Sequence, residues 1–245
     1  MATPITSNWC SKGYLPTSTI KNAKHTIMKD AVIIISGGMD STTMLYEYKD
    51  DIALAITFDY GSTQNGRERQ CAITHCQRLG IKHIVVRLDF MHRYFKSALL
   101  ESPDAIPEGN YDDENMKATV VPFRNGIMLA IACGIAESNG LKRVLIANHA
   151  GDHSIYPDCR GEFVEAMSLA MQMGTYENVK VFAPYTHISK VDIARHGKAL
   201  GLNYAETYSC YKGGEKHCGK CGTCRERRAA LREAGIIDTT QYLDD

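Results

Sequence analysis

The chain has 245 residues, of which 44% are hydrophobic and 23% charged, which suits one α/β domain with a small appendage. Its formal net charge is zero, which argues against general binding to nucleic acid or to anionic membranes. No stretch reaches about 18 consecutive apolar residues, and the N-terminus lacks the apolar segment of a signal peptide. We therefore expect a cytoplasmic protein with reduced cysteines, no membrane span and no direct nucleic-acid partner.

Composition changes twice along the chain. Residues 1–29 are polar and irregular, and we expect an N-terminal extension there, part of which docks through the sole tryptophan, Trp9. The main domain is expected over 30–205, and a cysteine-rich C-terminal subdomain over 206–245.

From residue 31 to about 200, near-continuous apolar runs alternate with helical patterns. Strands are expected at 31–35, 52–58, 82–88, 143–148 and 179–183, and helices at 40–49, 67–79, 124–138, 160–173 and 189–200. Apolar strands separated by helices predict an α/β fold with a five-stranded, doubly wound parallel sheet. In such folds ligands bind beyond the carboxyl ends of the strands.

The polar stretch at 89–123 interrupts this alternation. It is long for a plain connection, and we expect it to form a lid over the active site.

The most informative motif, Ser36-Gly37-Gly38-Met39-Asp40-Ser41, directly follows the first strand. Two glycines and then a polar helix start predict a turn in which the backbone can approach a phosphate closely. The helix directs unpaired N–H groups and its positive dipole end at the same point. Ser36, Ser41 and Thr42 add hydroxyl groups. The alternative, with no phosphate-binding role, is an ordinary strand-to-helix turn of a flavodoxin-like fold.

The motif contains no lysine and its glycines are adjacent, so it is neither a Walker A loop nor a dinucleotide-binding fingerprint. It resembles the phosphate loop of the PP-loop ATP pyrophosphatases. That resemblance implies an adenine nucleotide α-hydrolase-like domain that binds ATP for attack at the α-phosphorus, with pyrophosphate as the leaving group.

Four of the nine cysteines gather near the C-terminus, at Cys210, Cys218, Cys221 and Cys224. Closely spaced cysteine pairs separated by glycines predict a closed, structural zinc site with one ion per chain. An iron–sulfur cluster is the main rival, because such spacings also begin ferredoxin-type runs. His217 could replace a cysteine, although we expect it to be a solvated loop residue.

Further motifs follow in a fixed order: Phe58-Asp59-Tyr60-Gly61, Pro122-Phe123-Arg124-Asn125, Tyr156-Pro157-Asp158-Cys159-Arg160, Ala183-Pro184, Ser189-Lys190 and Thr207-Tyr208-Ser209-Cys210-Tyr211. Together with the phosphate loop and the cysteines, they resemble the 7-cyano-7-deazaguanine synthase (QueC) family over residues 31–235. Two features depart from that pattern. Residues 1–29 are extra, and Ser62-Thr63-Gln64-Asn65 replaces the family's usual Gln-Arg-His with one apparent insertion.

The resemblance implies a ligase that converts 7-carboxy-7-deazaguanine and ammonia to 7-cyano-7-deazaguanine, a queuosine precursor. It implies adenylated intermediates, ATP as co-substrate, release of AMP and pyrophosphate, Mg²⁺, and a homodimer. Two alternatives remain open: another PP-loop adenylating enzyme, such as a tRNA sulfur or amide transferase, and a non-catalytic nucleotide-binding module with a zinc ribbon.

The same resemblance suggests residue roles. ATP is expected to contact Ser36, Gly37, Gly38, Met39, Asp40, Ser41, Thr42, Phe58 and Asp59. Within this set, Asp40 is expected to hold magnesium or orient the loop, or alternatively only to satisfy N–H groups at the helix start.

Two cations at helix starts complete the expected catalytic set with Asp40. Arg124 follows Pro122, and its planar fork suits a phosphate or carboxylate. Lys190 opposes the helix dipole, which a nearby anion would explain. Surface salt bridging is the alternative for both.

Substrate binding is assigned to Tyr156, Asp158 and Arg160. Asp158 would accept hydrogen bonds from the guanine-type N–H edge, and Arg160 would pair with the substrate carboxylate.

Overall fold

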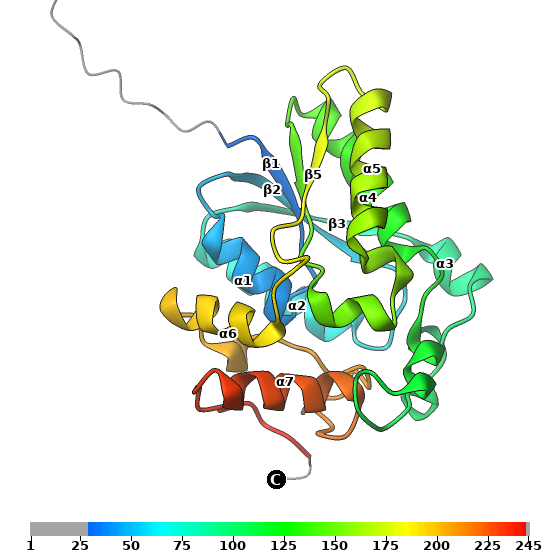
Figure 1. The fold of residues 1–245 in the computed structure, drawn as a ribbon, viewed down its shortest axis with the longest axis vertical. Coiled ribbons are helices and arrows are strands. Elements are labelled where there is room, and N and C mark those ends of the chain that lie inside the picture. Colours follow the sequence, from blue (N-terminus) through cyan, green and yellow to red (C-terminus); the bar gives the residue numbers. More distant parts are fainter. Residues whose placement is uncertain (1–28, 244–245) are drawn as a thin grey trace, which may run out of the picture.

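Five parallel strands form one sheet in the order β3-β2-β1-β4-β5 (Figure 1). The computed structural model describes residues 29–243. The strands are β1 (Ala31–Ile34), β2 (Ile52–Asp59), β3 (Lys82–Arg87), β4 (Arg143–Leu145) and β5 (Lys180–Phe182). The expected five-stranded, doubly wound parallel sheet is confirmed. The proposed extension at 1–29, including Trp9, falls outside the described residues except for Lys29.

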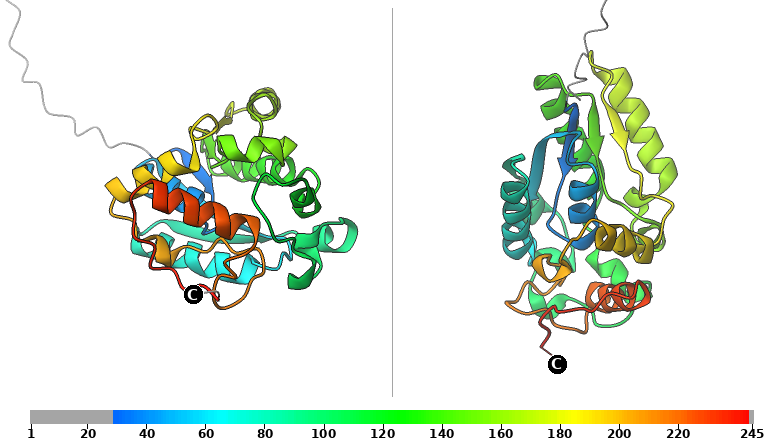
Figure 2. Two further views of the ribbon diagram at one scale, coloured as in Figure 1. Left: turned by 60° about the horizontal axis from the view of Figure 1, so that its bottom comes forward. Right: turned by 90° about the vertical axis from the view of Figure 1, so that its left-hand side faces the viewer.

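Helices cover both faces of the sheet, as the right-hand view of Figure 2 shows. They are α1 (Met39–Glu47), α2 (Asn65–Arg78), α3 (Asp89–Tyr94), α4 (Arg124–Ser138), α5 (Gly161–Gly174), α6 (Lys190–Ala199) and α7 (Gly222–Glu233). On one face α2 packs on β2 and β3, and α6 packs on α1; on the other, α4 and α5 cover β1, β4 and β5. The predicted helices agree with these bounds to within two residues.

Successive side chains of β1 point to opposite faces of the sheet, and on both faces they are apolar and packed under helices. Val32 belongs to the core under α4, with Leu129, whereas Ile33 belongs to the core under α1, with Leu45. All four side chains are fully buried. Burial of such an aliphatic side chain contributes roughly 1.5–3 kcal/mol, so β1 is anchored from both sides. This fixes the end of β1, where the phosphate loop begins.

The helical stretch Glu114–Ser138 is long and apolar enough to cross a membrane, by length and composition alone. Its α4 portion packs against β1 and β4 and buries Met128, Leu129 and Ala132. It is therefore a core helix of the domain.

The interruption at 89–123 is more ordered than the sequence indicated. It contains α3 and three 3₁₀ turns at Ala98–Leu100, Pro103–Ala105 and Glu114–Thr119. Leu99 and Met116 are fully buried and anchor this segment.

The C-terminal residues pack across the carboxyl ends of the strands, where α7 lies beside α6 (Figures 1 and 2). Arg227 of α7 is fully buried and donates hydrogen bonds to Thr207, Ser209, Thr240 and the Tyr204 carbonyl. The charged run Arg225-Glu226-Arg227-Arg228 has the pattern of a solvated helix face, but tertiary packing buries Arg227.

Candidate active site

The phosphate loop joins β1 to α1 and is held by its own serines. Ser41 Oγ accepts hydrogen bonds from the amides of Ser36 (3.2 Å) and Gly37 (3.4 Å), and the Gly38 amide donates to Ser36 Oγ (3.1 Å). The first-turn amides of α1 have no intrahelical partner, as at any helix start. The loop is therefore preformed, with its remaining donors directed at the space beyond the strand ends.

Gly37 is required by two features of this turn. Its φ is +99°, a conformation that side-chain-bearing residues rarely adopt, and an added Cβ would lie 2.1 Å from the Glu68 carbonyl oxygen. The phosphate loop thus touches the backbone of α2 directly, and only glycine permits that approach.

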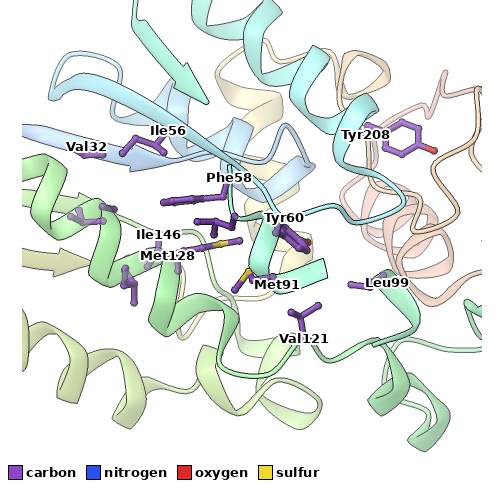
Figure 3. Packing of buried hydrophobic residues seen from close by; sticks show 14 of the residues in the cluster. Val32, Ile56, Phe58, Tyr60, Met91, Leu99, Val121, Met128, Ile146 and Tyr208 are labelled. Carbon is purple, nitrogen blue, oxygen red and sulfur yellow. The ribbon is translucent and has the colours of Figure 1, made fainter. Parts of the chain in front are cut away.

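A cavity opens at this edge, and its lining includes Ser36, Gly38, Met39, Asp40 and Ser41. It lies at the topological switch point, since residues after both β1 and β4 contribute to it. Its apolar part is formed by Phe58, Met128 and Ile146, which Figure 3 shows together among the buried residues. A flat base such as adenine fits a surface of this kind.

Lys190 occupies the centre of a charged cluster in this cavity. Its Nζ lies 3.2 Å from Asp40 Oδ2 and 2.7 Å from Glu226 Oε2, and the side chain is 11% exposed. Burial alone would lower the pKa of Lys190, but Asp40 and Glu226 hold it above its usual value. Lys190 is therefore charged, and its two carboxylate partners are partly buried, with side chains 21% (Asp40) and 17% (Glu226) exposed, so the pairs are not surface salt bridges.

Two buried oxygen atoms near the loop lack hydrogen-bond partners among residues 29–243: Asp40 Oδ1 and Thr42 Oγ1. Buried polar atoms without partners are rare and indicate a missing ligand or water. Asn148 Oδ1, in the cavity lining after β4, is unpartnered as well.

Arg124, at the start of α4, contributes a second cation to the cavity. Its guanidinium donates to the Tyr60 hydroxyl at 3.2 Å and stacks 5.8 and 5.9 Å from the Tyr60 and Tyr156 rings. It makes no salt bridge with any carboxylate in the described part of the chain. An anionic ligand would supply that missing charge.

Some expected site residues lie outside the cavity lining. Asp59 pairs with Arg69 at 2.9 Å, and Arg160 is exposed, with its Nε donating to the His153 carbonyl. Asp158 is buried and accepts from the Asn125 amide at 2.8 Å, so it caps α4. Phe58 and Tyr156 do line the cavity. The ligand contacts proposed for Asp59, Asp158 and Arg160 stay predictions.

Three titratable residues near the phosphate loop were not predicted from the sequence. Glu226 comes from α7, His149 from the segment after β4, and Glu68 from α2. His149 Nε2 lies 3.5 Å from Asp152 Oδ1, and the Tyr111 hydroxyl donates to the same oxygen at 2.8 Å. Only His149 carried a usable signal, because it closely follows a strand end where ligands gather.

The four cysteines converge as their spacing predicts. The Sγ atoms of Cys210, Cys218, Cys221 and Cys224 all lie within 4.8 Å of one another, and all four residues are buried. Thiolates about 2.3 Å from one tetrahedral ion lie about 3.8 Å apart, and the Cys218 and Cys224 sulfurs are separated by 3.9 Å. The donor set therefore fits a single soft metal ion such as zinc.

His217 is neither a ligand nor solvated. It is buried beside Tyr208 and Tyr242, and its Nε2 accepts from the Ser209 amide at 3.1 Å. Burial lowers the pKa of His217 to about 4, so the ring is neutral and serves as a hydrogen-bond acceptor. The expected solvated loop residue is thus a core residue of the C-terminal region.

Comparison with known proteins matches nearly the whole described chain to a single family. The family model "Queuosine biosynthesis protein QueC" matches residues 30–235. The chain belongs to the QueC family.

Two relatives illustrate how close the QueC match is. A 7-cyano-7-deazaguanine synthase of Porphyromonas gingivalis is 60% identical over 214 residues, covering 87% of this chain and 97% of the relative. The corresponding protein of Desulfotalea psychrophila is 49% identical over 218 residues, covering 88% and 100%. A solved NMN synthetase from Francisella tularensis has a TM-score of 0.48 at 15% identity, covering 88% of this chain and 81% of that one.

Proposed function

We propose that this protein is a 7-cyano-7-deazaguanine synthase that makes the nitrile from 7-carboxy-7-deazaguanine, ammonia and ATP. The observation that carries the proposal is 60% identity to a synthase of that name over 97% of its length. The cavity supports it, because the phosphate loop, an apolar surface and two cations meet there.

The reaction must overcome a poor leaving group, since ammonia cannot displace oxide from a carboxylate. Attack of the carboxylate on the α-phosphorus of ATP makes an acyl-adenylate and releases pyrophosphate. Ammonia then displaces AMP to give the amide. A second adenylation, on the amide oxygen, allows loss of AMP to give the nitrile.

The position of each residue in the cavity suggests its role in binding the nucleotide or the substrate. The phosphate loop and Lys190 bind the phosphates, with Lys190 balancing charge on the departing pyrophosphate. Arg124, which has no carboxylate partner among residues 29–243, pairs with the substrate carboxylate or the α-phosphate. Phe58 borders the adenine.

Two metals belong to the proposal. The unpartnered Asp40 Oδ1 suits Mg²⁺, which neutralises phosphate charge when bound. Zn²⁺ on the four cysteines would be structural, because four thiolates leave no open position. We also propose a cytoplasmic location and a homodimer. Size-exclusion chromatography with light scattering tests the oligomeric state.

The decisive test is to incubate the protein with 7-carboxy-7-deazaguanine, ATP, magnesium and ammonium, and to analyse products by mass spectrometry. The expected products are the nitrile, AMP and pyrophosphate. Arrest at the amide would contradict synthase activity, and ADP as the nucleotide product would contradict adenylation. No ATP cleavage would favour a binding module.

A further inference from the structure

Three carboxylates line the cavity: Asp40, Glu68 and Asp152. Asp40 is paired with Lys190, and Asp152 accepts hydrogen bonds from the Tyr111 hydroxyl and the His149 amide. The Glu68 side chain makes no hydrogen bond or ion pair with any residue between 29 and 243. Among these three, Glu68 alone keeps its carboxyl available to a ligand.

The position of Glu68 is fixed by the phosphate loop. Its backbone carbonyl lies against Gly37, and its partly accessible side chain faces the cavity from α2. The charged residue that acts on it from across the cavity is Arg124 of α4; on its own helix, Cys71 is the titratable neighbour. The carboxyl thus shares the cavity in which the loop would hold the phosphates of an adenylated substrate.

Nitrile formation requires a proton acceptor in this region. Ammonia carries three N–H bonds and the nitrile nitrogen carries none, so three protons must leave one nitrogen atom. One leaves when nitrogen bonds to the acyl carbon and the carbon–oxygen bond to AMP breaks. Two leave during dehydration of the amide, in which the carbon–oxygen bond to the second AMP also breaks.

We propose that Glu68 is the catalytic base that takes these protons from the substrate nitrogen, passing each to solvent between steps. The inference rests on the proposed function. In each transfer an N–H bond breaks, its electron pair stays with nitrogen, and an O–H bond forms on the Glu68 carboxylate. AMP departs with the electron pair of the carbon–oxygen bond.

The chemistry of the site suits this role. Burial raises the pKa of Glu68 to about 8, although Arg124 opposes the shift. A base whose pKa lies near the working pH accepts protons readily and also releases them. The carboxylates of Asp40 and Asp152 are already engaged by Lys190 and by the Tyr111 hydroxyl and His149 amide, whereas the Glu68 carboxyl is open to a substrate nitrogen.

The test separates nitrogen chemistry from adenylation, using Glu68→Gln because glutamine is isosteric with the protonated acid. In single turnovers without ammonium, we expect pyrophosphate release within about threefold of wild type. With saturating ammonium, amide and nitrile formation should fall by roughly 100-fold or more. Glu165→Gln, an exposed change on α5, should match wild type in both assays.

Two further readouts distinguish a base from a structural residue. At fixed free ammonia, the wild-type rate should rise with pH to about 8 and then level, whereas the Glu68→Gln rate should be flat. Hydroxylamine, a weakly basic nucleophile, should restore acyl transfer in the variant. If Glu68→Gln does not fold, Glu68→Ala with added formate takes its place, and formate should restore the rate.

Several results would overturn the proposal: nitrile formation by Glu68→Gln within about threefold of wild type, equal loss of pyrophosphate release, or no rescue by hydroxylamine or formate. Failure of the wild-type protein to form nitrile would instead contradict the proposed function itself, and with it this inference.

Discussion

Lys190 Nζ donates to Glu226 Oε2 at 2.7 Å, which ties the start of α6 to α7, the helix that carries Cys224. The same ammonium reaches Asp40 in the phosphate loop at 3.2 Å. One largely buried cation therefore connects the phosphate loop to the cysteine-rich C-terminal region, so that this region helps to shape the cavity.

Removal of this cation should affect catalysis more than folding. We expect Lys190→Ala to lower the rate of pyrophosphate release by roughly 100- to 1,000-fold, because charge on the departing phosphates loses its partner. Lys198→Ala, on the same helix but exposed, should change the rate by less than about twofold. Initial rates at saturating ATP and acid provide the measurement. A Lys190→Ala enzyme with near-normal turnover would exclude the proposed role.

Loss of one metal ligand should unfold the C-terminal region and disturb the site beyond it. We expect Cys218→Ser to lose bound zinc and to lower Tm by roughly 5–10 °C, since metal binding contributes directly to folding. Elemental analysis and thermal melts check both effects. Cys133→Ser, a buried thiol on α4, should leave the zinc content unchanged. Iron with visible absorbance in the wild-type protein would contradict the zinc assignment.

The phosphate loop should tolerate no side chain at position 37. Gly37→Ala combines an unfavourable φ with a clash against the Glu68 carbonyl, and we expect it to cost roughly 2–4 kcal/mol and to weaken ATP binding. Gly134→Ala, in the exposed interior of α4 with no atom near its added Cβ, should be neutral or stabilising by up to about 1 kcal/mol. Urea unfolding and nucleotide titration separate the effects. Equal stability of the two variants would refute the packing explanation.

The sequence predicts the sheet, the phosphate loop and the cysteine cluster because each depends on residues close together in the chain. Strand and helix periodicity are local, and three of the four cysteines, Cys218, Cys221 and Cys224, lie within seven residues of one another. By contrast, the burial of Arg227 follows from tertiary packing, and its neighbours Arg225, Glu226 and Arg228 give it the pattern of a solvated helix face. Glu68 lines the cavity and Glu226 pairs with Lys190 beside it, each from an element distant in sequence, and no local motif marks either residue.

Stability should depend on pH through Glu68, independently of activity. The folded-state pKa of about 8 lies above the ordinary glutamate value of 4.5, so between those values the folded protein binds more protons than the unfolded chain. Stability contributed by the protonated acid is therefore complete below about pH 4.5 and is lost as pH rises through 8.

Glu68→Gln removes this loss of stability, because glutamine stays neutral. We expect its Tm to exceed that of wild type by several degrees at pH 9 and by less than about 1 °C at pH 5. Glu165→Gln, an exposed change, should shift Tm equally at both pH values. A Glu68→Gln advantage that does not grow with pH would mean that Glu68 is ionised at neutral pH, which would remove the electrostatic basis for its role as a base.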